Sequence, residues 1–194
     1  MKHFFLPLNL VLACVLLTQL QGCAAPLIAA GAAGGATVAN DKRTTRSMVD
    51  DQVIETKIKD RIYSNANTAK RIHINVTCYN GIVLLTGETL SRSLRSEVIN
   101  IARNIDNVRR VHNEIRVADL TGFNSRTNDS WITSKVKTQM FTTKGFKSSQ
   151  IKVVTEAGVV YIMGLVTKDA GNRATEIARN ISGVKRVVKL FEYL

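Results

Sequence analysis

An internal repeat constrains the fold of this chain more than any other feature of its sequence. Residues 74–87 match residues 151–164 position by position, and residues 101–111 match residues 177–187. Repeat proteins that stack into a solenoid need at least about three copies to bury a continuous core. Two copies of a long unit therefore indicate two homologous domains that follow one another along the chain.

Each copy begins with a predicted helix. Apolar residues spaced four apart form one stripe in each copy: Ile54, Ile58 and Ile62 in the first, and Ile132, Val136 and Met140 in the second. This spacing is typical of a helix with one face in a core. Acidic and amide side chains suit the N-cap position, so Asp50 or Asp51 is expected to cap the first of these helices, and Asn128 or Asp129 the second.

The helix is followed in each copy by a predicted β-hairpin. Two β-branched runs meet at Asn80-Gly81 and at Ala157-Gly158, and Asn-Gly is the stronger hairpin signal of the two. Glycine closes the second strand of each hairpin. A second helix is expected over 91–104 and 168–180, and a last strand over 108–117 and 184–193. Because that strand arrives through a helical crossover, we predict an α+β fold of two α-β-β-α-β domains, each a three-stranded mixed sheet with two helices on one face.

The first 22 residues have the parts of a secretory signal. Lys2 and His3 precede an apolar run over 4–17, which is shorter than the roughly 20 residues that a membrane-spanning helix needs. The sequence Leu20-Gln-Gly-Cys23 resembles the lipobox of bacterial lipoproteins. The resemblance implies cleavage before Cys23, a diacylglycerol on its sulfur and an N-acyl group, and Ala24 resembles the signal for outer-membrane sorting. The alternative is an ordinary signal peptide with a chance cysteine.

The rest of the chain divides by composition. Residues 23–46 are rich in alanine and glycine near their start and are expected to form a lipidated tether, followed by domains at 47–118 and 119–194. The formal net charge of +12 suggests a polyanionic partner, either nucleic acid, an anionic membrane or an acidic polymer. An exported chain does not meet nucleic acid, so we expect none as a partner.

The repeated unit resembles the BON domain, whose hairpin carries Val and Leu around two glycines and whose last strand starts with Val-x-x-Val. The matching residues are Val76, Gly81, Val83, Leu85, Gly87, Val108 and Val111 in the first copy, and Val153, Gly158, Val160, Ile162, Gly164, Val184 and Val187 in the second. With the lipobox and tether, the chain is similar to outer-membrane lipoproteins with two BON domains. Gly81, Gly87, Gly158 and Gly164 are its predicted structural glycines.

The resemblance implies a binding protein rather than an enzyme. It implies that the second domain binds anionic phospholipid, and that the protein supports outer-membrane integrity from the periplasmic face and is enriched at cell-division sites. Outer-membrane assembly proteins are possible partners. No cofactor is implied apart from the acyl groups on Cys23. The alternative is a periplasmic adaptor that binds the envelope-assembly machinery.

One face of the first helix in the second copy is the candidate lipid-binding site. At about 100° per residue, its members fall away from the core stripe: Trp131, Ser134, Lys135, Lys137, Thr138 and Phe141. Aromatic rings flanked by lysines suit a membrane interface. The first copy has Val53 in place of Trp131, with Glu55, Lys57 and Asp60 on the outward face. The alternative is that the two aromatic rings pack against the other domain.

Other chemistry has little support in the sequence. His73 and His112 have no cysteine or carboxylate cluster at metal-ligand spacing, so no metal site is expected. No serine has a paired His and Asp, so no catalytic residue is expected. Cys78 is the only cysteine apart from those of the signal and the anchor, and it is expected to be a small packed residue.

Overall fold

The computed structural model describes residues 43–194. The predicted signal peptide, Cys23 and the tether up to residue 42 lie outside the described residues. The described residues lie in one compact unit, and this unit contains both copies of the repeat. Within residues 43–194, no helix is both long and apolar enough to cross a membrane.

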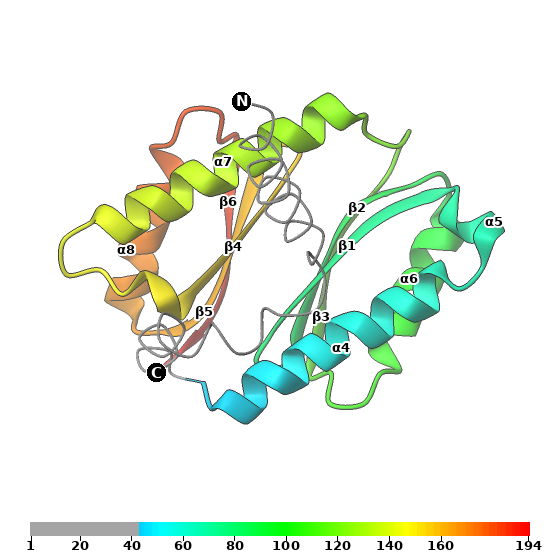
Figure 1. The fold of residues 1–194 in the computed structure, drawn as a ribbon, viewed down its shortest axis with the longest axis horizontal. Coiled ribbons are helices and arrows are strands. Elements are labelled where there is room, and N and C mark those ends of the chain that lie inside the picture. The colour runs from blue at the N-terminus through cyan, green and yellow to red at the C-terminus, as the bar shows by residue number, and fades with distance from the viewer. Residues whose placement is uncertain (1–42) are drawn as a thin grey trace, which may run out of the picture. The chain divides into compact units, whose positions relative to one another are not determined.

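Both copies have the predicted order of elements, with one short helical element in each that the sequence did not predict, α5 in the first and η2 in the second (Figure 1). The first contains α4 (Thr45–Tyr63), α5 (Ala66–Ala69), β1 (Ile72–Tyr79), β2 (Ile82–Thr89), α6 (Arg92–Arg103) and β3 (Arg110–Val117). The second contains α7 (Phe123–Thr142), the 3-10 turn η2 (Ser148–Gln150), β4 (Ile151–Glu156), β5 (Val159–Val166), α8 (Lys168–Arg179) and β6 (Arg186–Tyr193). Helix α4 begins two residues before the boundary of 47 that the sequence suggested.

The sheets have the predicted mixed topology. In the first, β2 lies between β1, to which it is antiparallel, and β3, to which it is parallel. The second sheet repeats this arrangement with β5 between β4 and β6. The α+β prediction with mixed sheets is confirmed.

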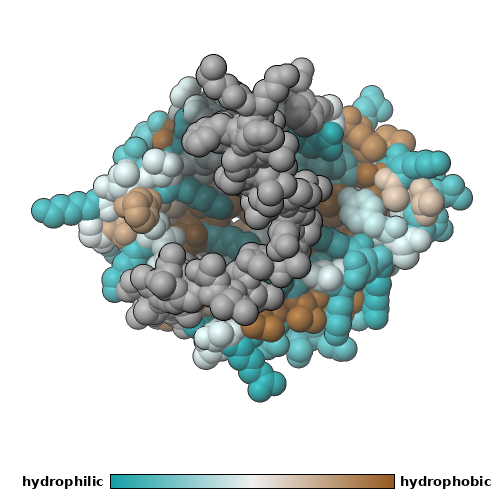
Figure 2. Space-filling model, viewed as in Figure 1, coloured by the Kyte–Doolittle hydropathy of each residue, from teal (hydrophilic) through white to brown (hydrophobic). Residues whose placement is uncertain are grey.

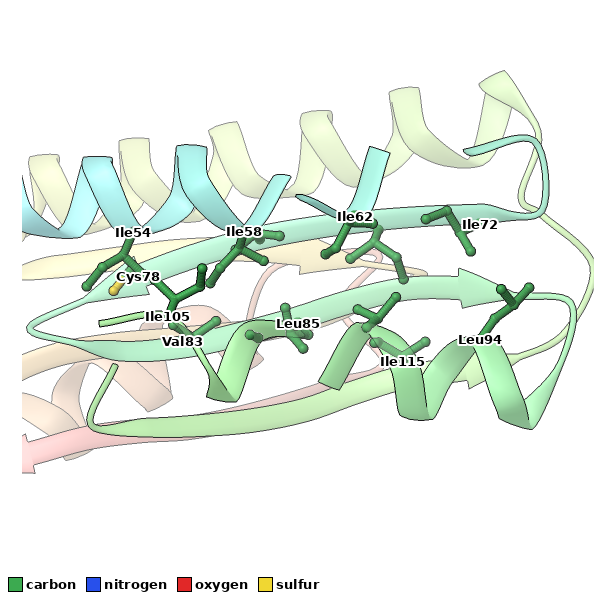
Figure 3. Close-up of a cluster of buried hydrophobic side chains, with 14 residues drawn as sticks. Ile54, Ile58, Ile62, Ile72, Cys78, Val83, Leu85, Leu94, Ile105 and Ile115 are labelled. Carbon is green, nitrogen blue, oxygen red and sulfur yellow. The ribbon is translucent and has the colours of Figure 1, made fainter. Parts of the chain in front are cut away.

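Each domain buries its predicted helical stripe against one face of its sheet. Ile54, Ile58 and Ile62 of α4 are at most 3% exposed and meet side chains from the strands and from α6 (Figure 3). Ile132, Val136 and Met140 of α7 are at most 1% exposed in the corresponding core of the second domain. Since α4 and α6 share one core with the same side of the strands, both helices cover the same face of the sheet.

The opposite faces of the two sheets pack against each other. A third buried cluster draws on both domains: Tyr79, Ile82 and Leu84 from the first, and Tyr161 and Met163 from the second. All five are at most 5% exposed. The compact unit therefore has its two sheets in the middle, with the helices of each domain on the outside (Figure 1).

The predicted N-caps are wrong. Helix α4 begins earlier than predicted and is capped by Thr44, whose hydroxyl accepts a hydrogen bond from the Ser47 N–H at 3.1 Å. Helix α7 begins at Phe123 after Gly122, which provides no side-chain cap. All four predicted caps therefore lie inside helices. Asp51 and Asp129 are instead buried, at 4% and 6% exposed.

These two buried aspartates hold the hairpin turns. The Asp51 carboxylate accepts the N–H groups of Asn80 and Gly81 at 2.7 and 2.8 Å. Asp129 accepts those of Ala157 and Gly158 at 2.7 and 2.8 Å. Each turn has positive φ at both central residues, as type I′ hairpins require. Each helix begins more than one turn before its aspartate, so the aspartate lies inside the helix, where it binds the hairpin turn instead of capping the helix.

The sequence suggested that Gly87 and Gly164 close their strands. This is wrong, because β2 and β5 each continue two residues further. Both glycines lie where the neighbouring strand comes very close. A Cβ on Gly87 would lie 1.9 Å from the His73 carbonyl oxygen, and one on Gly164 would lie 2.7 Å from that of Gln150. Close backbone approach therefore accounts for glycine at these two positions.

Candidate functional site

The outward face of α7 is exposed. Trp131 is 62% and Phe141 is 79% exposed, while Ser134, Lys137 and Thr138 are also exposed and Lys135 is half-buried. The structure thus brings the six predicted residues onto one helix face. The alternative in which both rings pack against the other domain is wrong, because the domains meet through their sheets.

Two lysines accompany the aromatic rings. The Lys135 ammonium lies 5.7 Å from the centroid of the Trp131 ring, a cation–π distance, and donates to the Ser182 carbonyl at 2.9 Å. Neither Lys135 nor Lys137 forms an ion pair with a carboxylate of residues 43–194. Both ammonium groups therefore keep their charge available to an external anion.

Two polar groups of this face form hydrogen bonds within the helix. The Ser134 hydroxyl donates to the Ser130 carbonyl at 2.9 Å, and the Thr138 carbonyl accepts from the Thr142 hydroxyl at 3.0 Å. The Trp131 and Phe141 rings project from this face into solvent. On the side shown in Figure 2, hydrophobic residues occur in scattered patches on a mostly hydrophilic surface.

The corresponding face of α4 differs in composition and in one predicted position. Val53, which stands at the place of Trp131, is 44% exposed. Glu55 was expected on the solvated face, but it is only 8% exposed. It accepts the Cys78 N–H at 2.8 Å and the Lys152 ammonium at 2.7 Å. Glu55 is therefore a contact between the domains, because the edge of α4 faces the second domain.

Polar contacts surround the apolar cluster between the sheets. Glu192 accepts hydrogen bonds from Asn80 at 2.6 Å and Arg109 at 2.8 Å. Burial raises the pKa of Glu192, but these hydrogen bonds and the nearby arginine charges outweigh it and leave the pKa below its usual range. Tyr161 donates to Glu114 at 3.3 Å. These contacts fix the position of one sheet relative to the other.

The structure also assembles a cluster that sequence reasoning missed. His73, Glu88 and Glu156 offer ligand atoms that lie within 4.8 Å of one another. The sequence shows no carboxylate at metal-ligand spacing from His73, because Glu88 lies on the neighbouring strand and Glu156 in the other domain. Burial raises the pKa of Glu156, and the charge of Glu88 adds to this effect. The hairpin register alone pairs His73 with Glu88, whereas Glu156 comes from the other domain.

Cys78 is the packed residue that its context predicted. Its side chain is fully buried, and the thiol donates to the Asp51 carboxylate at 3.1 Å. Burial and the Asp51 charge raise its pKa, so the thiol stays protonated and unreactive. We expect no modification of residues 40–194 by an aromatic disulfide reagent in native buffer, and one thiol modified after denaturation. Rapid modification of the native protein would contradict this assignment.

Comparisons with known proteins agree with the fold of two repeated domains. The model of the BON domain family matches residues 50–119 and 128–194. The chain is 38% identical over 175 residues to the outer membrane lipoprotein DolP of Haemophilus influenzae, covering 90% of each chain. It is 33% identical to a 21 kDa hemolysin of Actinobacillus pleuropneumoniae, covering 79% of each. It is 28% identical to the osmotically-inducible protein Y of Escherichia coli, covering 83% of this chain and 89% of that one.

Proposed function

Since this chain belongs to the BON domain family, we propose that it is an outer-membrane lipoprotein whose second domain binds anionic phospholipid through α7. The observation that carries the proposal is the pair of exposed rings, Trp131 and Phe141, on one helix face with Lys135 and Lys137. A large aromatic side chain kept in water loses the free energy that burial provides. A membrane surface supplies both the apolar boundary for the rings and the phosphates for the lysines.

The charge distribution supports the second domain as the lipid-binding one. Residues 120–194 contain 12 basic and 5 acidic residues, whereas residues 41–119 contain 14 and 10. The second domain therefore has the larger excess of positive charge in fewer residues. Each lysine or arginine near an anionic surface contributes about 1 kcal/mol to binding.

A lipid anchor on Cys23 would hold this domain close to the outer membrane. Lipidation of Cys23 and a tether that ends before α4 remain predictions, supported by the lipobox and by the relationship to an outer membrane lipoprotein. A flexible chain of about 20 residues has a root-mean-square reach of roughly 25 Å, so α7 can contact the membrane that holds the anchor. A role in outer-membrane integrity, and enrichment at division sites, follow from the family resemblance and belong to the same proposal.

Co-sedimentation with vesicles tests the proposal. Residues 40–194, which form a compact unit, should bind vesicles that contain an anionic phospholipid and not zwitterionic ones. Reversing both lysine charges, in Lys135→Glu/Lys137→Glu, removes about 2 kcal/mol of attraction, so the affinity should fall by at least roughly 30-fold.

The matched control is Lys57→Glu/Arg61→Glu, which makes the same charge change at exposed positions of α4. It should retain most of the binding. An equal loss in the control would assign binding to net charge rather than to α7. If the wild-type protein binds neither kind of vesicle, the lipid role is wrong, and the alternative to test next is that the exposed face of α7 contacts envelope-assembly proteins.

A further inference from the structure

We propose that His73, Glu88 and Glu156 form a zinc-binding site that links the two domains. His73 on β1 and Glu88 on β2 are directly opposite each other in the antiparallel pair, so both side chains leave the same face of the first sheet. Glu156, the last residue of β4, reaches this face from the second domain. The three ligand atoms lie within 4.8 Å of one another. The proposal is independent of lipid binding by α7.

One nitrogen of the His73 imidazole, Nε2, lacks a hydrogen-bond partner. This atom is buried and is not bonded to any group of residues 43–194. Buried polar atoms in folded proteins nearly always have a partner, so an exception points to a bound species. Either ring nitrogen of a neutral imidazole can bind zinc, and a ring nitrogen of His73 lies within 4.8 Å of an oxygen of each carboxylate.

Both carboxylates are buried and held in place. Glu88 is fully buried and Glu156 is 5% exposed. The Oε2 atom of Glu156 accepts from Asn75 at 2.9 Å and from Thr86 at 3.2 Å. Hydrogen bonds of this kind orient the ligands of metal sites. These donors to Glu156 are neutral, so a cation is the species that best offsets its charge in this buried position.

The charge of Glu88 is partly balanced from the solvent side. Arg116, half of whose side chain is exposed, pairs with one carboxylate oxygen, and the Thr121 hydroxyl donates to the other at 3.1 Å. Carboxylate oxygens have further lone pairs, so Glu88 can bind a metal while it keeps these contacts. Arg116 pairs with Glu88 and not with Glu156, so the Glu156 carboxylate forms no ion pair with a lysine or arginine of residues 43–194.

The internal repeat shows that the fold does not require these three residues. In the repeat alignment, His73 and Glu88 correspond to Gln150 and Leu165, and Glu156 corresponds to Tyr79. There, the Tyr79 hydroxyl donates to the Gln150 carbonyl at 3.2 Å and accepts from the Leu165 N–H at 3.4 Å. At one of the two equivalent places, a tyrosine bonded to the backbone therefore occupies the position that Glu156 has at the other. The His-Glu-Glu set at the other place is a difference that a metal ion explains.

Zinc fits this donor set better than the hard cations do. Calcium and magnesium prefer sites made of oxygen ligands only, whereas zinc readily takes imidazole nitrogen together with carboxylate oxygen. Tetrahedral zinc with bonds of about 2.1 Å has its ligand atoms about 3.4 Å apart. The side chains therefore need to close by roughly 1 Å around the ion, with a water molecule as the fourth ligand.

Metal analysis of the mature protein, purified in detergent, tests the site. After incubation with zinc chloride and exhaustive dialysis, we expect one zinc per chain by mass spectrometry of the metal, and a higher melting temperature with zinc than with magnesium. His73→Gln and Glu156→Gln should each weaken zinc binding by at least about tenfold. Glutamine is the residue that the second copy carries at the position of His73, so the first variant is expected to fold.

The matched control is His112→Gln, the same change at the other histidine of residues 43–194. It should bind zinc as the wild type does, and circular dichroism should show that all variants are folded. The proposal is wrong if the wild-type protein retains no zinc. It is equally wrong if His73→Gln and Glu156→Gln bind zinc with unchanged affinity.

Discussion

Trp131→Glu should abolish binding to anionic vesicles and leave the melting temperature unchanged. The indole is 62% exposed, so its loss removes little packing from the folded protein. At a membrane surface, the substitution replaces an amphipathic ring with a carboxylate that the anionic phosphates repel. It also removes the ring that lies near the Lys135 ammonium. Co-sedimentation and thermal denaturation of residues 40–194 measure the two effects separately.

Val53→Glu provides the matched control, because Val53 is the exposed residue at the same place in the first domain. It should bind as the wild type does. Trp131 is the only tryptophan, so its fluorescence should shift to the blue when anionic vesicles are added to the wild-type protein. Trp131→Glu protein that co-sediments as well as the wild type would rule out α7 as the membrane contact.

Asp51→Ala should lower the free energy of unfolding by roughly 3–5 kcal/mol, the cost of breaking a buried charge pair. The carboxylate accepts two N–H groups of the hairpin turn, and Arg43 donates to it at 2.6 Å. The substitution leaves these donors without an acceptor in a place that water reaches poorly. Urea denaturation followed by circular dichroism measures the loss.

Asp50→Ala is the control for this prediction. The neighbouring carboxylate is 49% exposed and lies 3.9 Å from the guanidinium of Arg46, so its removal should change stability by no more than about 0.5 kcal/mol. Similar losses for the two variants would show that Asp51 contributes only helix propensity or surface charge.

Local signals in the sequence were enough to predict each domain. The stripes that contain Ile58 and Val136 predicted the buried faces of α4 and α7, because a helix repeats every 3.6 residues. Asn80-Gly81 predicted the hairpin, because both residues adopt positive φ easily. The same spacing predicted that Trp131 and Phe141 lie away from the core, and both rings are exposed.

Signals of this kind failed where a residue's partner is distant in the chain. Asp51 and Asp129 resembled caps because acidic residues favour helix starts, yet each one lies inside a helix and binds a turn some 30 residues away. Glu55 was placed in solvent because its position is polar, but the second domain covers it.

The sequence by itself therefore determined the main helices and strands, their order and the core face of each helix, because these depend on periodicity and on turn residues within short segments. The family followed from the resemblance of both copies to the BON motif. Only the tertiary structure decided that the two sheets pack face to face and that Glu156 lies beside His73 and Glu88. The physical reason is that packing between sheets depends on the shape and polarity of whole faces, and these faces exist only after each domain has folded.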